Sequence, residues 1–300
     1  MGSYNKLGLT TSILTYIIWG LLPLYWALLE HVDAMSVLAH RIIWSFVFMI
    51  IIVGVTQRKR FIADCKMLWA DKKKGALLVG ASLLISCNWL IYIWAVSNNH
   101  VMDTSIGYYI NPLLSVLLGV VVFKEYLIPA KWFAIAIAAL GILMLTILHG
   151  VFPWISIGLA LTFAIYGALK KKLNINPFSS ITLETFFVTP LALIYLFFID
   201  DFTLAYFNHG MTSTAWLLVF AGVTTSVPLV LFSFGANLLP LNVLGFLQYI
   251  APTIAFVLSI FYFHEVFGLA QMLAFTCIWI ALAIFSMSEK LPNVPLKKIK

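Results

Sequence analysis

The sequence predicts an all-α polytopic membrane protein, with ten transmembrane helices arranged as two five-helix inverted-topology repeats. Of its 300 residues, 63% are hydrophobic and 10% are charged, whereas soluble domains average about 45–50% apolar and about 25% charged residues. Apolar stretches of about 20 residues, the length that crosses a bilayer as a helix, recur along the chain. Two of these stretches, one in each half of the chain, are also related in sequence.

Apolar runs between polar breaks predict where the ten spans lie. The run nearest the N-terminus is predicted to stay as a helix, because no small-x-small cleavage site follows it. The connections are short, apart from a basic loop near 57–74 and an acidic one near 200–212. The predicted spans are 8–29, 35–56, 75–96, 103–123, 130–148, 151–169, 179–199, 213–236, 241–263 and 268–287.

The distribution of positive charge predicts the orientation of these spans. Every lysine and arginine except Arg41 falls in the termini or in alternate connections that share a side with them. Because positively charged loops stay on the cytoplasmic side, both termini should be cytoplasmic in a protein of the cytoplasmic (cell) membrane. The run Lys170, Lys171 and Lys172 is interpreted as part of this inner anchor. The orientation of the chain in the lipid bilayer thereby explains its net charge of +7. This charge calls for no nucleic acid partner.

The stretches Tyr109–Glu125 and Tyr249–Glu265 align without a gap at an offset of 140 residues. Trp19-Gly20 and Tyr166-Gly167 form a weaker match. The alignment predicts one repeat in residues 1–150 and a second in 151–300, the latter ending in a short basic tail. Because five spans is an odd number, the repeats enter the membrane in opposite directions, a common feature of secondary transporters. The identical residues of the first stretch are Tyr109, Ile110, Pro112, Leu118, Phe123 and Glu125.

Two charged residues fall well inside predicted spans, away from the span ends, and both are candidates for a substrate pathway. Arg41 lies near the outer end of the second span, and Glu184 lies near the inner end of the seventh, at a mirrored position. A charge inside a membrane is costly and should face protein or water. The two are separated by more than about 10 Å in depth at a helical rise of about 1.5 Å per residue, so no direct ion pair is expected. His40 is a candidate proton relay, and a structural anchor near the interface is the alternative for each charge.

The fourth and ninth spans carry prolines at matching positions, Pro112 and Pro252, which predict helix breaks close to a transport site. In the fourth span, polar residues recur at helical spacing and form one stripe. The alternative role for such residues is the packing of helices against each other. The further pathway candidates are Asn88, Tyr92, Tyr108, Asn111, Gln248 and Tyr249.

Motifs for covalent chemistry or nucleotide binding are not found in the sequence, so we expect no enzyme activity, cofactor or metal site. The three cysteines lack the spacing of a metal site or a disulfide framework. An ion gradient, with a proton or cation as the coupling ion, or the gradient of the solute itself, is left as the driving force. Nothing in the sequence decides whether the protein forms a homodimer.

The chain resembles the RarD family of EamA-type transporters, in the drug/metabolite transporter superfamily, over nearly its whole length. The resemblance implies ten helices in two inverted halves, cytoplasmic termini and activity as a permease or exporter, in a family whose name is linked to chloramphenicol sensitivity. Lys170 and Val266 depart from the family pattern, and both are expected at helix ends. The matching segments include IIWGLLPLYW at 17–26, LAHRIIWSFVF at 38–48, NWLIYIWAV at 88–96, IGYYINPLLSVLLG at 106–119, LETFFVTPLALIYL at 183–196, LPLNVLGFLQYIAPT at 239–253 and FTCIWIALAIFS at 275–286.

The sequence therefore predicts a secondary active transporter of a small organic metabolite or drug-like solute, working by alternating access. Aromatic walls with few charges suit a semi-polar solute such as an amino acid or an aromatic metabolite. A non-transporting scaffold or sensor on the same fold is the alternative, and it predicts that Arg41, Asn88 and Glu184 pack in a dry, fully satisfied core. A membrane enzyme is a more distant alternative, because it needs clustered nucleophiles or metal ligands.

Overall fold

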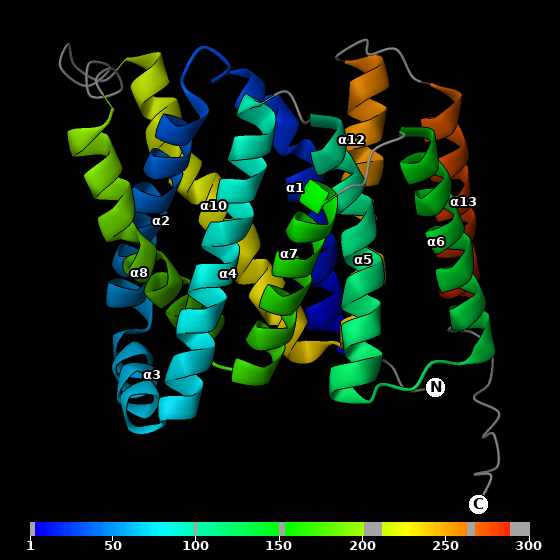
Figure 1. The fold of residues 1–300 in the computed structure, drawn as a ribbon. Coiled ribbons are helices and arrows are strands. Elements are labelled where there is room, and N and C mark those ends of the chain that lie inside the picture. Colours follow the sequence, from blue (N-terminus) through cyan, green and yellow to red (C-terminus); the bar gives the residue numbers. More distant parts are fainter. Residues whose placement is uncertain (1–3, 99–100, 150–153, 201–211, 263–267, 289–300) are drawn as a thin grey trace, which may run out of the picture.

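The computed structural model describes residues 4–98, 101–149, 154–200, 212–262 and 268–288. Within these ranges the regular structure is entirely helical. Most of the long helices run between two common levels, so the molecule has two ends (Figure 1). We call one of them the α3 end, because helix α3 lies there, where α1 begins and α13 ends. The all-α class predicted from composition is confirmed.

The helices follow the predicted apolar runs, usually with two to four residues added at an end. Several begin at a polar residue whose side chain caps the free backbone N–H groups of the first turn. Asp33 accepts from the N–H groups of Met35 and Ser36 at 2.9 and 3.1 Å, and Asn176 accepts from Phe178 and Ser179. The bounds are α1 Lys6–Ala27, α2 Ala34–Thr56, α3 Arg58–Ala70, α4 Lys72–Ser97, α5 Val101–Phe123, α6 Pro129–His149, α7 Trp154–Leu173, α8 Pro177–Phe198, α10 Ser213–Leu238, α11 Leu241–Leu247, α12 Ile250–Phe261 and α13 Leu269–Ser288.

Seven helical segments of the described chain are long and apolar enough to cross a membrane, judged by length and composition. Each of the ten predicted spans overlaps a helix, or in one case the pair α11 and α12. The number of helices that cross the membrane, and their arrangement as inverted repeats, stay predictions. The seven segments are Lys6–Ala27, Ala34–Thr56, Lys72–Tyr92, Ile106–Phe123, Pro177–Phe198, Ser213–Leu238 and Leu241–Leu258.

Two local predictions differ from the structure. The basic segment near 57–74 is not a loop, since most of it forms the largely exposed helix α3. Helix α5 continues through Pro112 without interruption, so this proline is not a helix break. In the matching region, the helical path is interrupted at Gln248 and Tyr249, and Pro252 lies in the first turn of α12. A proline in a first turn is tolerated, because its missing N–H has no partner there in any case.

The two predicted halves are packed into each other rather than side by side as separate lobes. Helices α4 and α5 pack on α7, α2 packs on α8 and α10, and α1 packs on α10 and α12. Helix α5 also packs on α11, and α6 packs on α13. Each of these contacts joins the first half to the second. Groups in the interior are therefore contributed by both halves.

Glycines allow some of these helices to approach closely, as is common where helices associate in membranes. A Cβ atom built at Gly222 of α10 would lie 2.3 Å from the backbone carbon of Trp44 in α2. The space is occupied by backbone, which cannot swing aside as a flexible side chain can. The crossing of α2 and α10, which brings Arg41 next to Thr225, thus depends on this glycine.

We predict that Gly222→Ala destabilises the purified protein by about 1–3 kcal/mol or more, the usual cost of overpacking a close contact. Gly54→Ala is the matched control, because a Cβ at Gly54 meets nothing within 4 Å and alanine is the better helix former by about 1 kcal/mol. Thermal unfolding in detergent measures both. Equal stability of the two variants would contradict the close packing of α2 on α10.

Candidate functional site

Arg41 is held in the interior by aromatic rings and one hydroxyl group. Its guanidinium carbon lies 4.6 Å from the ring centroid of Trp26 on α1 and 5.6 Å from that of Trp89 on α4. Its Nε donates to Thr225 Oγ1 on α10 at 3.0 Å. Arginine over an indole ring is stabilised by the quadrupole of the ring, by about 0.5–2 kcal/mol. The side chain is thus oriented by three helices besides its own.

Two predicted pathway tyrosines lie close to this arginine. The rings of Tyr92 on α4 and Tyr108 on α5 are 6.1 Å apart between centroids, and both phenols are within electrostatic range of Arg41. Tyr108 is 48% exposed. We call Trp26, Arg41, Trp89, Tyr92, Tyr108 and Thr225 the arginine site. Five helices from both halves of the chain build it.

Glu184 lies in a second cluster, which belongs to the second half alone. Its Oε1 accepts from Lys170 Nζ at 2.5 Å and from Ser180 Oγ at 2.7 Å, and its Oε2 accepts from Tyr166 Oη at 2.9 Å. Lys170 also donates to Ser180 Oγ at 2.6 Å. All four side chains are buried. Lys170 was expected only as part of a basic inner anchor, but its side chain is buried and paired with Glu184.

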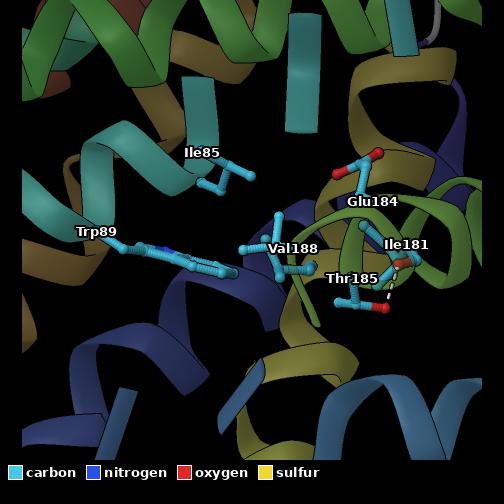
Figure 2. Close-up of a pocket in the computed structure, with 7 residues that line it drawn as sticks. Ile85, Trp89, Ile181, Glu184, Thr185 and Val188 are labelled. Carbon is cyan, nitrogen blue, oxygen red and sulfur yellow. Dashed lines mark hydrogen bonds between the residues drawn. The ribbon is translucent and has the colours of Figure 1, made fainter. Parts of the chain in front are cut away.

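A small pocket lies beside Glu184, between α4, α8 and α10. It is bounded by Ile85 and Trp89 from α4 and by residues of α8, including Glu184 and Val188, with Leu229 from α10. Figure 2 shows Trp89 on one side of this pocket and Glu184 on the other. Trp89 contacts Arg41 as well. One tryptophan therefore separates the arginine site from the Glu184 pocket.

The remaining polar residues of α5 pair with the interrupted helix of the other half. Gln248 Nε2 donates to Ser115 Oγ at 3.2 Å, and Ser115 Oγ donates to Asn111 Oδ1 at 3.4 Å. Tyr249 is fully buried, and its hydroxyl donates to the carbonyl of Tyr109 at 3.3 Å. These bonds join α5 to the α11–α12 region. Asn111, Gln248 and Tyr249 thus hold the two halves together, which is also the alternative role expected for them.

The contacts of Asn88 and His40 are with other parts of the protein than the rings of the arginine site. Asn88 Nδ2 donates to the carbonyl of Leu159 at 2.8 Å and to Thr162 Oγ1 at 2.9 Å, so this side chain fastens α4 to α7. His40 is buried, and it is within electrostatic range of Asp200, beyond the end of α8. As the sequence predicts, Arg41 and Glu184 form no ion pair with each other in the described residues.

Glu125, which follows α5 at the α3 end, joins three helices. Its Oε1 accepts from the N–H of Leu241 at 2.6 Å. Its Oε2 accepts from the backbone N–H and the side-chain Nδ2 of Asn242 at 2.8 and 2.7 Å. Lys171 Nζ lies 3.7 Å from the carboxylate and donates to the carbonyl of Leu239. We call this arrangement the Glu125 latch, because it ties the end of α5 in one half to α7 and α11 in the other.

The sequence did not point to several residues of these clusters. Neither Trp26 nor Thr225 stands out in the sequence, because tryptophans and threonines are frequent in this chain. Lys170 was assigned to a basic run with Lys171 and Lys172.

Comparison with known proteins identifies the family of the chain. The model of the EamA-like transporter family matches residues 6–147 and again residues 153–287. The uncharacterized transporter YojE of Bacillus subtilis is 44% identical over 292 residues, covering 95% of each chain. Protein RarD of Escherichia coli is 38% identical, covering 94% of this chain and 95% of that protein. The chloramphenicol-sensitive protein RarD of Pseudomonas aeruginosa is 29% identical over 92% of both.

A solved structure, described as the crystal structure of a protein, shares the fold with a TM-score of 0.74 at 16% identity. The match covers 96% of this chain and all of the other. The apolar helical bundle and these matches together define a multi-pass membrane transporter. The chain belongs to the EamA-like transporter family, and within it to the RarD group of the drug/metabolite transporter superfamily.

We predict that Lys170→Met destabilises the protein by about 3–5 kcal/mol, because it leaves the buried Glu184 without its cation. The double variant Lys170→Met with Glu184→Leu should recover much of this loss, since it removes both charges. Lys172→Met is the matched control, because Lys172 is exposed in the same run. Thermal unfolding of the purified variants provides the measurement, and a Lys170→Met protein as stable as Lys172→Met would contradict the buried pair.

Proposed function

We propose that the protein is a secondary transporter of a small organic solute, and that it works by alternating access. In this proposal, residues 1–150 and 151–300 form two repeats that change their packing around a central binding site. The separate matches of one family model to each half support it, because inverted repeats place the site between them near the middle of the bilayer. The coupling ion in this proposal is a proton or a cation.

The observation that carries the proposal is the arginine site. A positive charge within an apolar bundle is costly, yet Arg41 lies here among side chains from five helices of both halves. A rearrangement of the halves would therefore alter the surroundings of this charge. That is the property required of a site that is exposed alternately to the two sides.

The Glu125 latch supplies the second part of the mechanism. It joins the halves at the α3 end by charge-assisted hydrogen bonds, which contribute about 1.5–3 kcal/mol each. In the proposal the structure is closed at this end, and the site opens to it when Glu125 releases Asn242. The positive-inside rule assigns the α3 end, with the basic helix α3, to the cytoplasmic side of the cell membrane.

The scaffold alternative explains only part of the interior. It expects Arg41, Asn88 and Glu184 to be fully satisfied by other groups of the protein. Asn88 and Glu184 meet this expectation, because each is bonded to neighbouring helices. Arg41 does not, since rings and a single hydroxyl surround it, and this difference favours transport.

Transport by the purified protein in liposomes tests the proposal. With a panel of labelled organic acids, amines and amino acids, we expect saturable flux of at least one solute above that of empty liposomes. Arg41→Gln should reduce this flux by at least about tenfold, the effect of losing about 1.4 kcal/mol of binding. Arg58→Gln, at an exposed arginine of α3, should leave the flux unchanged. No flux above background for any solute would contradict transport.

Opening at the α3 end can be followed with a cysteine at position 115, which is buried between α5 and α11. In a background without the native cysteines, Ser115→Cys should react slowly with a maleimide added from the α3 side. Adding Glu125→Gln should speed this labelling by about tenfold or more, because it weakens a closing contact by at least about 1.4 kcal/mol. Glu30→Gln, at an exposed acid far along the chain, serves as the control. Equal labelling rates of Ser115→Cys with and without Glu125→Gln would rule out the latch as a gate.

A further inference from the structure

The hydrogen-bonding capacity of Arg41 is largely unused. A guanidinium group has five N–H donors, and the bond from Nε to Thr225 uses one of them. The two tryptophan rings contact the group without accepting a conventional hydrogen bond. In the part of the chain that the structure describes, no aspartate or glutamate forms an ion pair with Arg41. The terminal Nη groups therefore remain available to an anion.

The second half of the chain shows how this protein neutralises an interior charge with its own residues. Arg41 lies seven residues after Ala34, where α2 begins, and Glu184 lies seven after Pro177, where α8 begins. The capping residues Asp33 and Asn176 also correspond, because each directly precedes the first residue of its helix. The two charges thus occupy corresponding positions in the predicted repeats.

The preceding helix, α7, provides a counter-ion for Glu184. The corresponding helix, α1, provides none for Arg41. Lys170 of α7 neutralises Glu184. By the match of Trp19-Gly20 with Tyr166-Gly167, the position in α1 that corresponds to Lys170 is Pro23, and α1 contains no acidic residue at all. The charge on Arg41 is left for another group to balance.

We infer that Arg41 binds the carboxylate of the solute, and that this solute is a net monoanion with an apolar body. The inference rests on the proposed function and names the solute class for its site. A guanidinium edge accepts a carboxylate through two parallel hydrogen bonds. The exposed ring of Tyr108 and the adjacent Tyr92 offer flat apolar surface to the rest of the molecule.

Charge balance separates this class from two others. One arginine and one carboxylate make a neutral pair, which is the favourable arrangement in a medium that solvates charge poorly. A phosphate monoester carries more negative charge than a single arginine can neutralise. An amino acid zwitterion adds an ammonium group, which would leave the occupied site with a net positive charge. The site should therefore prefer a simple carboxylate to the matching amino acid or amide.

Matched solutes test the inference on the purified protein in nanodiscs by isothermal titration. The carboxylates are phenylpropionate, indolepropionate and hexanoate, and their primary amides form the neutral set. Phenylalanine, tryptophan and norleucine have the same carbon skeletons with an added amino group. We expect at least one carboxylate to bind about tenfold or more tightly than both of its partners. Arg41→Gln should abolish this preference, whereas Arg58→Gln should retain it.

Arg41→Lys provides a second variant that keeps the positive charge, in case glutamine disturbs folding. It should weaken carboxylate binding while preserving the order of the three solutes, since lysine lacks the planar fork. The inference is overturned if no carboxylate binds, if an amide or amino acid binds as tightly as its carboxylate, or if Arg41→Gln leaves the preference intact. Flux of neutral or zwitterionic solutes alone would overturn the inference but not the proposed transport. Absence of any flux, with Arg41-dependent carboxylate binding retained, would overturn transport but not the binding site.

Discussion

A charge within an apolar helical bundle must be neutralised, and this constraint organises the interior of the protein. Glu184 meets it through Lys170, Ser180 and Tyr166, which are buried on the same two helices of one half. Arg41 meets it only in part, through two indole rings and one hydroxyl. The first arrangement is complete and stabilises structure. The second is incomplete, and in the proposed function an exchangeable partner completes it.

The packing of the halves determines where this incomplete site can form. Because α1, α2, α4 and α5 each contact helices of the second half, the arginine site and the Glu125 latch both join residues from the two halves. The latch lies at the α3 end, whereas Arg41 lies nearer the opposite end of α2 (Figure 1). Helix α5 connects the two, because it carries Tyr108 and ends next to Glu125.

The sequence predicted the membrane class and the helical segments, because apolar length and helical spacing are local properties. It also named Arg41, Tyr92 and Tyr108, which the structure brings close together. It did not predict the partners of the charged residues. The pairing of Lys170 with Glu184, and the approach of Trp26 and Thr225 to Arg41, depend on how distant helices cross. The helix break predicted at Pro112 is wrong for a related reason. A proline weakens a helix locally, but α5 is packed against α7 and α11 and continues through Pro112. Glu265, which aligns with Glu125, and Val266, which departs from the family pattern, lie outside the described residues.

The most direct test of this account is an experimentally determined structure of the protein saturated with a carboxylate that binds it. The account predicts that the carboxylate lies within hydrogen-bonding distance, about 3 Å, of the Arg41 Nη atoms. The apolar body of the solute should lie against Tyr108, while Glu184 keeps its bond to Lys170. A solute bound elsewhere, or an Arg41 already paired with an acidic residue of the protein, would contradict it.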